Sequence, residues 1–160
     1  MVLTEIGHVT LAEAMFAKDY WLAWSDVPDG SEWAGTPPAE DTSAINLLSE
    51  VGRIKNLVKE YVVLDEAGII EVDNLKWTVS GIRTKYIYLK FTFDQTHNST
   101  DEIYQLGLFT DVVPSPGFET EEYIQPVNLD DEGNLILVEN QPVLYRNSAT
   151  RETYEYVITF

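Results

Sequence analysis

One alternating stretch, Thr84–Asp94, constrains the fold more than any other part of the sequence. Its large apolar residues recur at every second position, which is the period of a β-strand with one buried face. They are Ile87, Leu89, Phe91 and Phe93. Such a strand needs partner strands and a second layer, and the similarly alternating segment Arg151–Phe160 is the expected partner. The core face of that segment would carry Tyr154, Tyr156, Ile158 and Phe160.

These two segments predict an all-β fold with minor α, an antiparallel β-sandwich with a short N-terminal helix. Residues 1–160 are expected to form a single β-sandwich domain, because 160 residues suit one domain and 44% apolar residues suffice for a two-layer core. The other expected strands span 20–25, 55–64, 69–72, 75–80, 104–110, 123–129, 135–138 and 143–146. Turn residues predict hairpins around 65–68, around 130–134 and, into the last strand, around 147–150.

Helix-capping residues predict two short helices. Thr10-Leu11-Ala12-Glu13 has capping-box spacing, which predicts a helix over about 10–18. A second helix is expected to run from Thr42 or Ser43 through Glu50. Both are short, so the chain remains predominantly β.

The segment over about 26–41 is expected to be a long surface loop, because prolines and glycines punctuate it. Loops of this length in a compact domain are commonly functional or disordered. Trp33 lies near the middle of the loop. Packing of Trp33 back onto the domain is favoured, and contact with a partner is the alternative, since aromatic side chains often anchor interfaces.

The charge balance argues against nucleic-acid binding. The sequence has 27 Asp and Glu against 10 Lys and Arg, a formal net charge of −17, whereas binding to phosphate backbones requires Lys and Arg. The segment 91–145 holds no Lys or Arg, and seven of the ten basic residues lie between Arg53 and Lys90. High solubility is one explanation of the acidic surface. Contact between oppositely charged regions of neighbouring molecules is another.

The sequence carries no pattern for catalysis, a cofactor or a metal. With no cysteine and two histidines, a zinc site is not expected. Phosphate-loop, dinucleotide and nucleophile-elbow motifs are absent, so we predict no enzyme and no cofactor. Asn128–Glu139 resembles a calcium loop in spacing, but its flanks alternate like strands, so a β-turn is favoured. Neither a signal peptide nor a membrane span is expected.

Four phrases of the sequence carry a resemblance to a known family. They are Leu48–Arg53 (LSEVGR), Tyr104–Pro114 (YQLGLFTDVVP), Leu135–Val143 (LILVENQPV) and Tyr145–Phe160 (YRNSATRETYEYVITF). Through them the sequence resembles small virion structural proteins of tailed bacteriophages, found with contractile-tail, baseplate and neck components. The likeness extends over most of the chain and brings no catalytic residue with it.

The resemblance implies a non-enzymatic structural protein of the virion, part of the tail baseplate or of the neck or collar, assembled in the host cytoplasm. Its implied partners are other virion structural proteins, contacted in a symmetric ring on a partner platform, and neither nucleic acid nor membrane. The candidate interface residues are Trp33, Arg53, Lys85, Lys90, Glu121, Glu122, Asp130 and Asp131.

A carbohydrate-binding β-sandwich module is the alternative function. Sugar rings stack on exposed aromatic side chains, although aromatic residues in strands more often belong to the core. The candidate side chains for such stacking are Trp21, Trp24, Trp33 and Trp77. Tryptophan fluorescence that is blue-shifted and insensitive to glycans would exclude this function.

Overall fold

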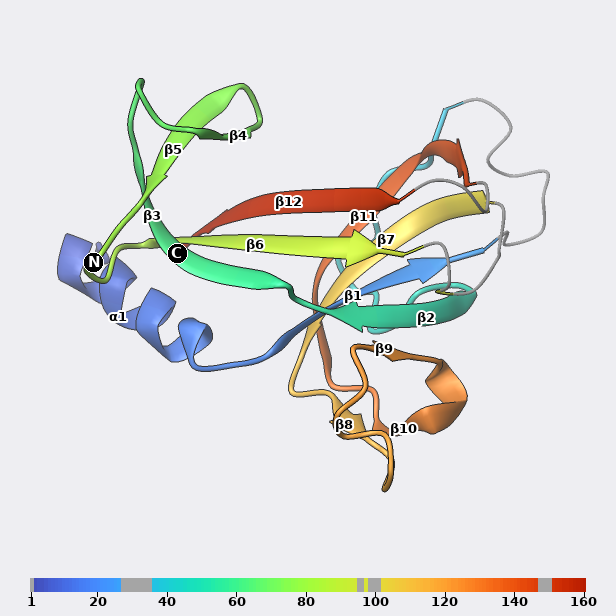
Figure 1. The fold of residues 1–160 in the computed structure, drawn as a ribbon. Coiled ribbons are helices and arrows are strands. Elements are labelled where there is room, and N and C mark those ends of the chain that lie inside the picture. Colours follow the sequence, from blue (N-terminus) through green and yellow to red (C-terminus); the bar gives the residue numbers. More distant parts are fainter. Residues whose placement is uncertain (1, 27–35, 95–96, 98–101, 147–150) are drawn as a thin grey trace. The chain divides into compact units, whose positions relative to one another are not determined.

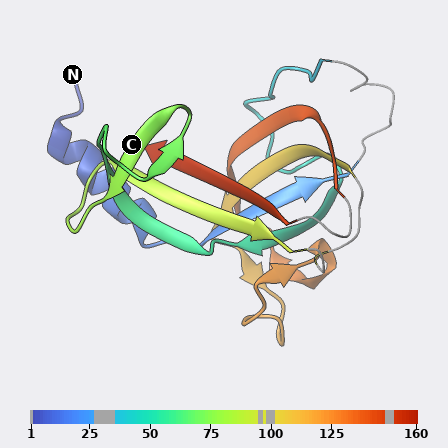
Figure 2. The ribbon, with the colours of Figure 1, turned by 45° about the horizontal axis from the view of Figure 1, so that its top comes forward.

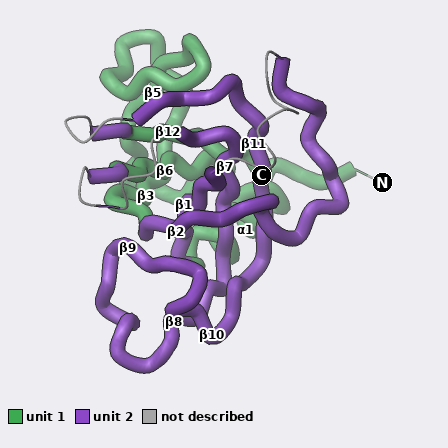
Figure 3. The backbone as a smooth tube through the Cα atoms, turned by 90° about the vertical axis from the view of Figure 1, so that its right-hand side faces the viewer, with its two compact units in different colours: residues 1–18, 56–92, 153–160 green, residues 19–55, 93–152 purple. Residues whose placement is uncertain are grey.

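The computed structural model describes residues 2–26, 36–94, 97, 102–146 and 151–160 (Figure 1). The chain is mostly β with one N-terminal helix, and its strands pair antiparallel. The predicted fold class is thus confirmed, and the elements are consistent with a β-sandwich or barrel. The chain divides into two compact units (Figure 3). Unit 1 comprises Met1–Lys18, Asn56–Thr92 and Thr153–Phe160, and unit 2 comprises Asp19–Lys55 and Phe93–Glu152. That the chain is a single domain stays a prediction.

Unit 1 is built on a five-stranded sheet in the order β12-β6-β3-β5-β4. Its elements are α1 (Glu5–Phe16), β3 (Val58–Leu64), β4 (Ile70–Val72), β5 (Leu75–Val79), β6 (Tyr86–Phe93) and β12 (Glu152–Thr159). β6 is the strand predicted from the alternating stretch, and its four predicted core residues are fully buried. β12 lies beside β6, as predicted. The predicted core residues of the last segment are only half-buried, because β12 is the outermost strand of the sheet.

The predicted helix over about 10–18 begins too late. Thr4 is the N-cap of α1, since its Oγ1 accepts a hydrogen bond from the Gly7 N–H at 3.2 Å. Thr10 lies inside the helix, where its hydroxyl donates to the Ile6 carbonyl at 2.8 Å. A threonine that bonds back to the preceding turn is compatible with a helix interior. In the part of the chain that the structure describes, no helix is long and apolar enough to cross a membrane.

The strand expected over 55–64 is β3, which begins only at Val58, and Lys55 is instead the last residue of a strand in another sheet. β2 (Glu50–Lys55) ends before β3 begins and belongs to the sheet of unit 2. The expected return strand also pairs differently, because β5 lies between β3 and β4. β4 and β5 form a hairpin through Asp73 and Asn74, whose φ angles of 54° and 62° suit a two-residue turn. Neither turn residue is glycine, so the sequence signal for this hairpin is weak.

Unit 2 contains a second five-stranded sheet, in the order β11-β7-β1-β2-β9, and a two-stranded sheet of β8 and β10. The new elements are β1 (Tyr20–Ser25), β7 (Glu102–Thr110), β8 (Val113–Pro114), β9 (Tyr123–Ile124), the 3-10 turn η1 (Pro126–Asn128), β10 (Leu129–Asp131) and β11 (Asn134–Tyr145). β1 is central, and all its residues are buried. Gly107 in β7 allows a close approach, since a Cβ there would lie 2.7 Å from Leu47 Cδ2.

Three predictions about unit 2 are wrong. No helix forms over 42–50, because Asp41 Oδ1 accepts bonds from the Ser43 N–H and hydroxyl at 2.8 and 2.7 Å and holds the segment in turns. The strands around 130–134 do not pair as expected, since β10 pairs with β8 and β11 with β7. Around 147–150, which lies outside the described residues, the two flanking strands join different sheets, β11 beside β7 and β12 beside β6. Turn signals do not reveal such distant partners.

Candidate interaction site

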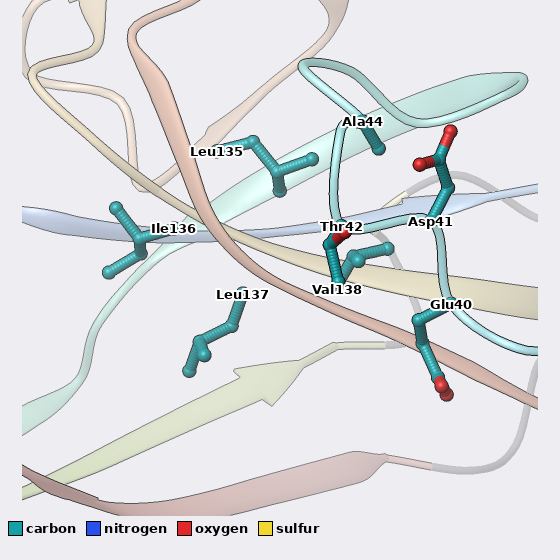
Figure 4. A pocket seen from close by; sticks show the side chains of 8 residues that line it. All are labelled: Glu40, Asp41, Thr42, Ala44, Leu135, Ile136, Leu137 and Val138. Atoms are coloured by element: carbon teal, nitrogen blue, oxygen red, sulfur yellow. The ribbon is translucent and has the colours of Figure 1, made fainter.

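A pocket with a volume of about 290 Å³ lies between the segment 40–44 and β11 (Figure 4). It is lined by Glu40, Asp41, Thr42, Ala44, Leu135, Ile136, Leu137 and Val138. Asn140 holds the segment against β11, because its backbone N–H donates to Glu40 Oε1 at 3.3 Å and its Nδ2 donates to the Pro38 carbonyl at 3.1 Å. Leu135 and Val138 of β11 point toward this segment, which carries two carboxylates, whereas Ile136 and Leu137 point to the other side of the strand (Figure 4).

Hydrogen bonds hold both carboxylates of the pocket. Its Asp41 carboxylate accepts hydrogen bonds from the Ser43 hydroxyl and N–H, and these bonds lower the pKa of Asp41. The Glu40 carboxylate is bonded to Asn140. The eight described lining residues include no histidine, lysine or cysteine that these carboxylates could activate. The pocket can take an apolar side chain beside an anionic rim.

Arg53, a candidate interface residue, is fully buried and is not available to a neighbouring protein. Its Nε and Nη2 donate to the two carboxylate oxygens of Glu50 at 2.7 and 2.6 Å. Its Nη1 donates to the Glu132 carbonyl at 2.6 Å, and its guanidinium lies 4.1 Å from the Phe109 ring centroid. The prediction of an interface role for this residue is wrong, because its guanidinium is buried and paired with groups inside unit 2.

Lys85 and Lys90, also candidate interface residues, have partners inside unit 1. Lys85 Nζ lies 2.9 Å from Glu5 Oε1, and the hydrogen bond that Lys85 donates to Glu5 raises the pKa of Lys85. Lys90 Nζ lies 2.8 Å from Glu155 Oε1, and the hydrogen bond from Lys90 lowers the pKa of Glu155. Both lysines are half-buried. They remain interface candidates, but with charges that are already partly compensated.

The acidic candidates Glu121, Glu122, Asp130 and Asp131 are all exposed in unit 2. Glu121 and Glu122 precede β9, and the other two belong to β10. Asp130 Oδ1 accepts a bond from the Ser115 hydroxyl, and Asp131 Oδ1 accepts one from the Gly133 N–H, each at 2.8 Å. The structure thus places all four in one unit without showing what they contact.

The expected loop over 26–41 is described only in part. Residues 27–35, with Trp33, lie outside the described residues, and 36–41 form neither helix nor strand. The choice between packing and partner contact for Trp33 therefore stays a prediction.

The three described tryptophans proposed for sugar stacking are buried. Trp24 packs on Phe93 and Tyr123, with ring centroids 4.4 and 5.7 Å away, and Trp77 packs on Tyr86 at 5.0 Å. Trp21 belongs to the core cluster of unit 2. The carbohydrate function is therefore wrong for these three side chains, because none presents an open ring to a sugar.

The near-match to a calcium loop, Asn128–Glu139, spans the end of η1, β10 and the first half of β11. Its Gly133 has a φ of 75°, and a Cβ there would lie 2.2 Å from the Thr110 carbonyl oxygen, so the backbone itself requires this glycine. Among the residues that the structure describes, no cluster of three or more His, Asp or Glu could hold a metal ion. That calcium does not bind here stays a prediction, which calorimetric titration tests.

The two units differ in charge and in apolar exposure, a separation that sequence reasoning missed. Unit 1 holds 6 Lys and Arg against 8 Asp and Glu, a net charge of −2, and unit 2 holds 4 against 19, a net charge of −15. Most exposed large apolar side chains of the described chain also lie in unit 1. They are Val2, Leu3, Ile6, Leu11, Leu57, Val63, Leu64, Ile69, Leu75, Val79 and Ile82. The segment 57–82 indicates this exposure in the sequence, because its strands carry apolar residues at odd-numbered and even-numbered positions alike.

Comparison with known proteins identifies a family for the whole chain. No curated protein matches the sequence. A family model, described as "Baseplate wedge 3 tail fiber network component", matches residues 1–160.

Proposed function

The chain belongs to the baseplate wedge 3 tail fiber network component family, and we propose that it acts there through protein–protein contacts alone, as one subunit of a ring. The family match confirms the resemblance to structural proteins of tailed phages. It makes the chain a structural component of the tail baseplate, and therefore of the virion, with other tail proteins as neighbours. The match over residues 1–160 is the observation that carries the proposal.

The charge of the chain favours a ring that forms on a partner platform over free self-association. Each copy carries a net charge of −17, so isolated copies repel one another. Lys85 and Lys90 already pair with Glu5 and Glu155, which leaves less positive charge for a neighbouring copy than the sequence suggests. Copies placed side by side on a platform, during assembly in the host cytoplasm, make head-to-tail contacts that close into a ring.

This role needs neither catalysis nor a cofactor. The pocket beside β11 supports it, because an apolar wall with nearby carboxylates suits a protruding side chain of a neighbouring tail protein. The exposed carboxylates of Glu121, Glu122, Asp130 and Asp131 are further candidates for contact with basic neighbours.

A phage with an amber codon in place of an early codon of the gene tests the proposed function. In a non-suppressing host, we expect particles with incomplete baseplates and a loss of infectivity, and the wild-type chain supplied from a plasmid should restore both. The purified wild-type particles should contain several copies of the chain per tail. Complete, infectious tails made without the chain would contradict the proposal.

A further inference from the structure

The outer part of the unit 1 sheet is a hairpin of β4 and β5 that continues from β3 (Figures 1 and 2). Cross-strand pairing places Leu64 opposite Trp77, and Trp77 opposite Ile70. Leu75 and Val79 share the same side of the sheet, since each lies two residues from Trp77 along β5. We call this surface the hairpin face. Its members are Val62, Leu64, Ile70, Val72, Leu75, Trp77 and Val79.

The hairpin face has a buried centre and an exposed apolar rim. Its buried members, Val62, Val72 and Trp77, belong to one core cluster. The rim side chains are large and about half exposed, at 59% for Leu64, 48% for Leu75 and 50% for Val79. Contiguous exposed apolar side chains on a soluble protein mark interaction surfaces. The centre of an interface is also its most apolar part.

The charges around the hairpin face are mainly acidic. Residues 64–79 contain four Asp and Glu against one Lys, a net charge of −3. Glu66 and Asp73 are exposed in the turns that bound the hairpin face, whereas Glu71 lies opposite Lys76 on the other face of the hairpin. Asp65 accepts hydrogen bonds from the Thr78 hydroxyl at 2.8 Å and from a backbone N–H. A protein that covers the hairpin face would therefore meet apolar side chains bordered by free carboxylates.

We propose that the hairpin face docks this chain onto a different tail protein, one that presents an apolar patch bordered by Lys and Arg. The inference rests on the proposed structural function and adds the docking surface and the chemistry of the partner. Charge complementarity selects this occupant, because a second copy would set the acidic turns of one hairpin face against those of the other, whereas basic side chains would pair with Glu66 and Asp73. Unit 1, at −2, also opposes association far less than unit 2 does at −15.

Replacing the apolar rim tests the docking surface. Leu75→Thr together with Val79→Thr removes apolar area and keeps β-branched side chains that suit strands. The matched control replaces Ile45 and Val127, which are 77% and 82% exposed in unit 2, by Thr. Each variant is supplied to the amber phage, and its copies per purified tail are counted by mass spectrometry.

We expect at least about tenfold fewer copies of the rim variant, since losing interface anchors commonly costs an order of magnitude in affinity. The control should be incorporated like wild type. Equal incorporation of both variants would overturn the proposal.

A variant with altered charges tests the same docking surface if the Thr variant fails to fold. Glu66→Lys together with Asp73→Asn reverses one exposed charge and removes another, and it leaves the hairpin face intact because Asn tolerates the positive φ of residue 73. This variant should melt within a few degrees of wild type, yet its incorporation should also fall at least about tenfold, because basic partner side chains would repel it. Wild-type incorporation of the folded charge variant would contradict the proposal.

Photocrosslinking in assembled tails identifies the occupant. A benzophenone amino acid in place of Leu75 should crosslink to a non-identical tail protein, at a peptide where Lys or Arg adjoins apolar residues. Crosslinks to a second copy of the chain would overturn the proposal, as would no crosslink in tails that contain the chain. Absence of the wild-type chain from purified tails is a different result, which would overturn the proposed function itself.

Discussion

At the scale of the residue, Arg53 shows how a charged side chain becomes part of a core. It pairs with Glu50 of its own strand β2, and its guanidinium lies over the Phe109 ring of β7. It also reaches the turn before β11 through the Glu132 carbonyl. A buried charge is costly unless it is paired and its donors are satisfied. The planar guanidinium of Arg53 can pair with a carboxylate and satisfy its remaining donors at the same time, whereas the ammonium of a lysine could not.

Replacement of Arg53 by Met should lower the free energy of unfolding by about 3–5 kcal/mol, because it leaves the half-buried Glu50 carboxylate without its partner. Denaturant unfolding measures the change. Adding Glu50→Gln to Arg53→Met should recover part of the loss, since the unpaired charge is then gone. A loss below about 1 kcal/mol for the single variant would show that the pair is dispensable.

His97 gives the described structure a residue that responds to pH. Its Nδ1 accepts a hydrogen bond from the Asp94 N–H at 3.0 Å, and its ring stacks on Tyr123 at 5.0 Å. Burial lowers the pKa of His97 from its ordinary 6.5, with Arg146 adding to the effect and with Asp94 and Glu122 opposing it. A lowered folded-state pKa stabilises the protein above the unfolded-state value, and this stability is lost as the pH falls below it.

We therefore expect the urea midpoint to fall when the pH is lowered from about 7.5 to about 5.5, because the unfolded state then binds the proton more readily. His97→Gln should show a smaller fall. His8→Gln, which changes the other histidine of the sequence, should keep the full fall. An equal pH dependence in wild type and His97→Gln would contradict this assignment.

At the scale of the element, the sequence predicts strands well where one face alone is buried. The alternation of β6 and β12 identifies both strands and their adjacency. Pairing between strands distant in sequence is not encoded in local turn signals, so the partners of β10 and β11 were assigned wrongly. Local hydrogen bonds explain both errors in the predicted helices. The Thr4 cap makes α1 begin earlier than predicted, and the Asp41 turn forms where a second helix was expected.

Removal of Arg151–Phe160 should abolish the cooperative unfolding transition. The deletion takes away β12, including Tyr156, whose ring meets Phe91 edge-on at 6.3 Å. Loss of a large, fully buried apolar side chain costs about 2–5 kcal/mol, and each half-buried side chain of the deleted segment should contribute part of that. Together with the lost strand pairing, these contributions approach the stability of a whole domain, about 5–15 kcal/mol. Thr159→Ala at an exposed position should change the melting temperature little. A truncated chain with a wild-type melting curve would show that β12 is peripheral.

At the scale of the whole molecule, the division into a nearly neutral unit and an acidic unit organises the proposed contacts. The sequence showed acidic and basic stretches, but unit 1 combines segments from both ends and the middle of the chain. The pairs that neutralise its lysines are also distant, as Lys85 and Glu5 are separated by 80 positions. Reasoning from local sequence could therefore place the charges but not their partners.

Reversal of both Lys85 and Lys90 to Glu should lower the stability only slightly, because partly exposed ion pairs contribute little. If these lysines meet acidic residues of a neighbouring copy, the double variant should be lost from purified tails. Exchanging the charges of Lys85 and Glu5, as Glu5→Lys with Lys85→Glu, restores this ion pair within the chain. The exchange therefore distinguishes the contribution of Lys85 to stability from its contact with a neighbouring copy. Normal incorporation of the Lys85 and Lys90 double variant would exclude charge pairing between copies.

A cryo-electron microscopy reconstruction of the intact tail tests the account most directly. We predict that the chain lies in the baseplate in several copies around the tail axis. We also predict that the hairpin face of each copy lies against a non-identical tail protein, with Lys or Arg near Glu66 and Asp73. A reconstruction without the chain in the baseplate, or with the hairpin face open to solvent, would contradict the account.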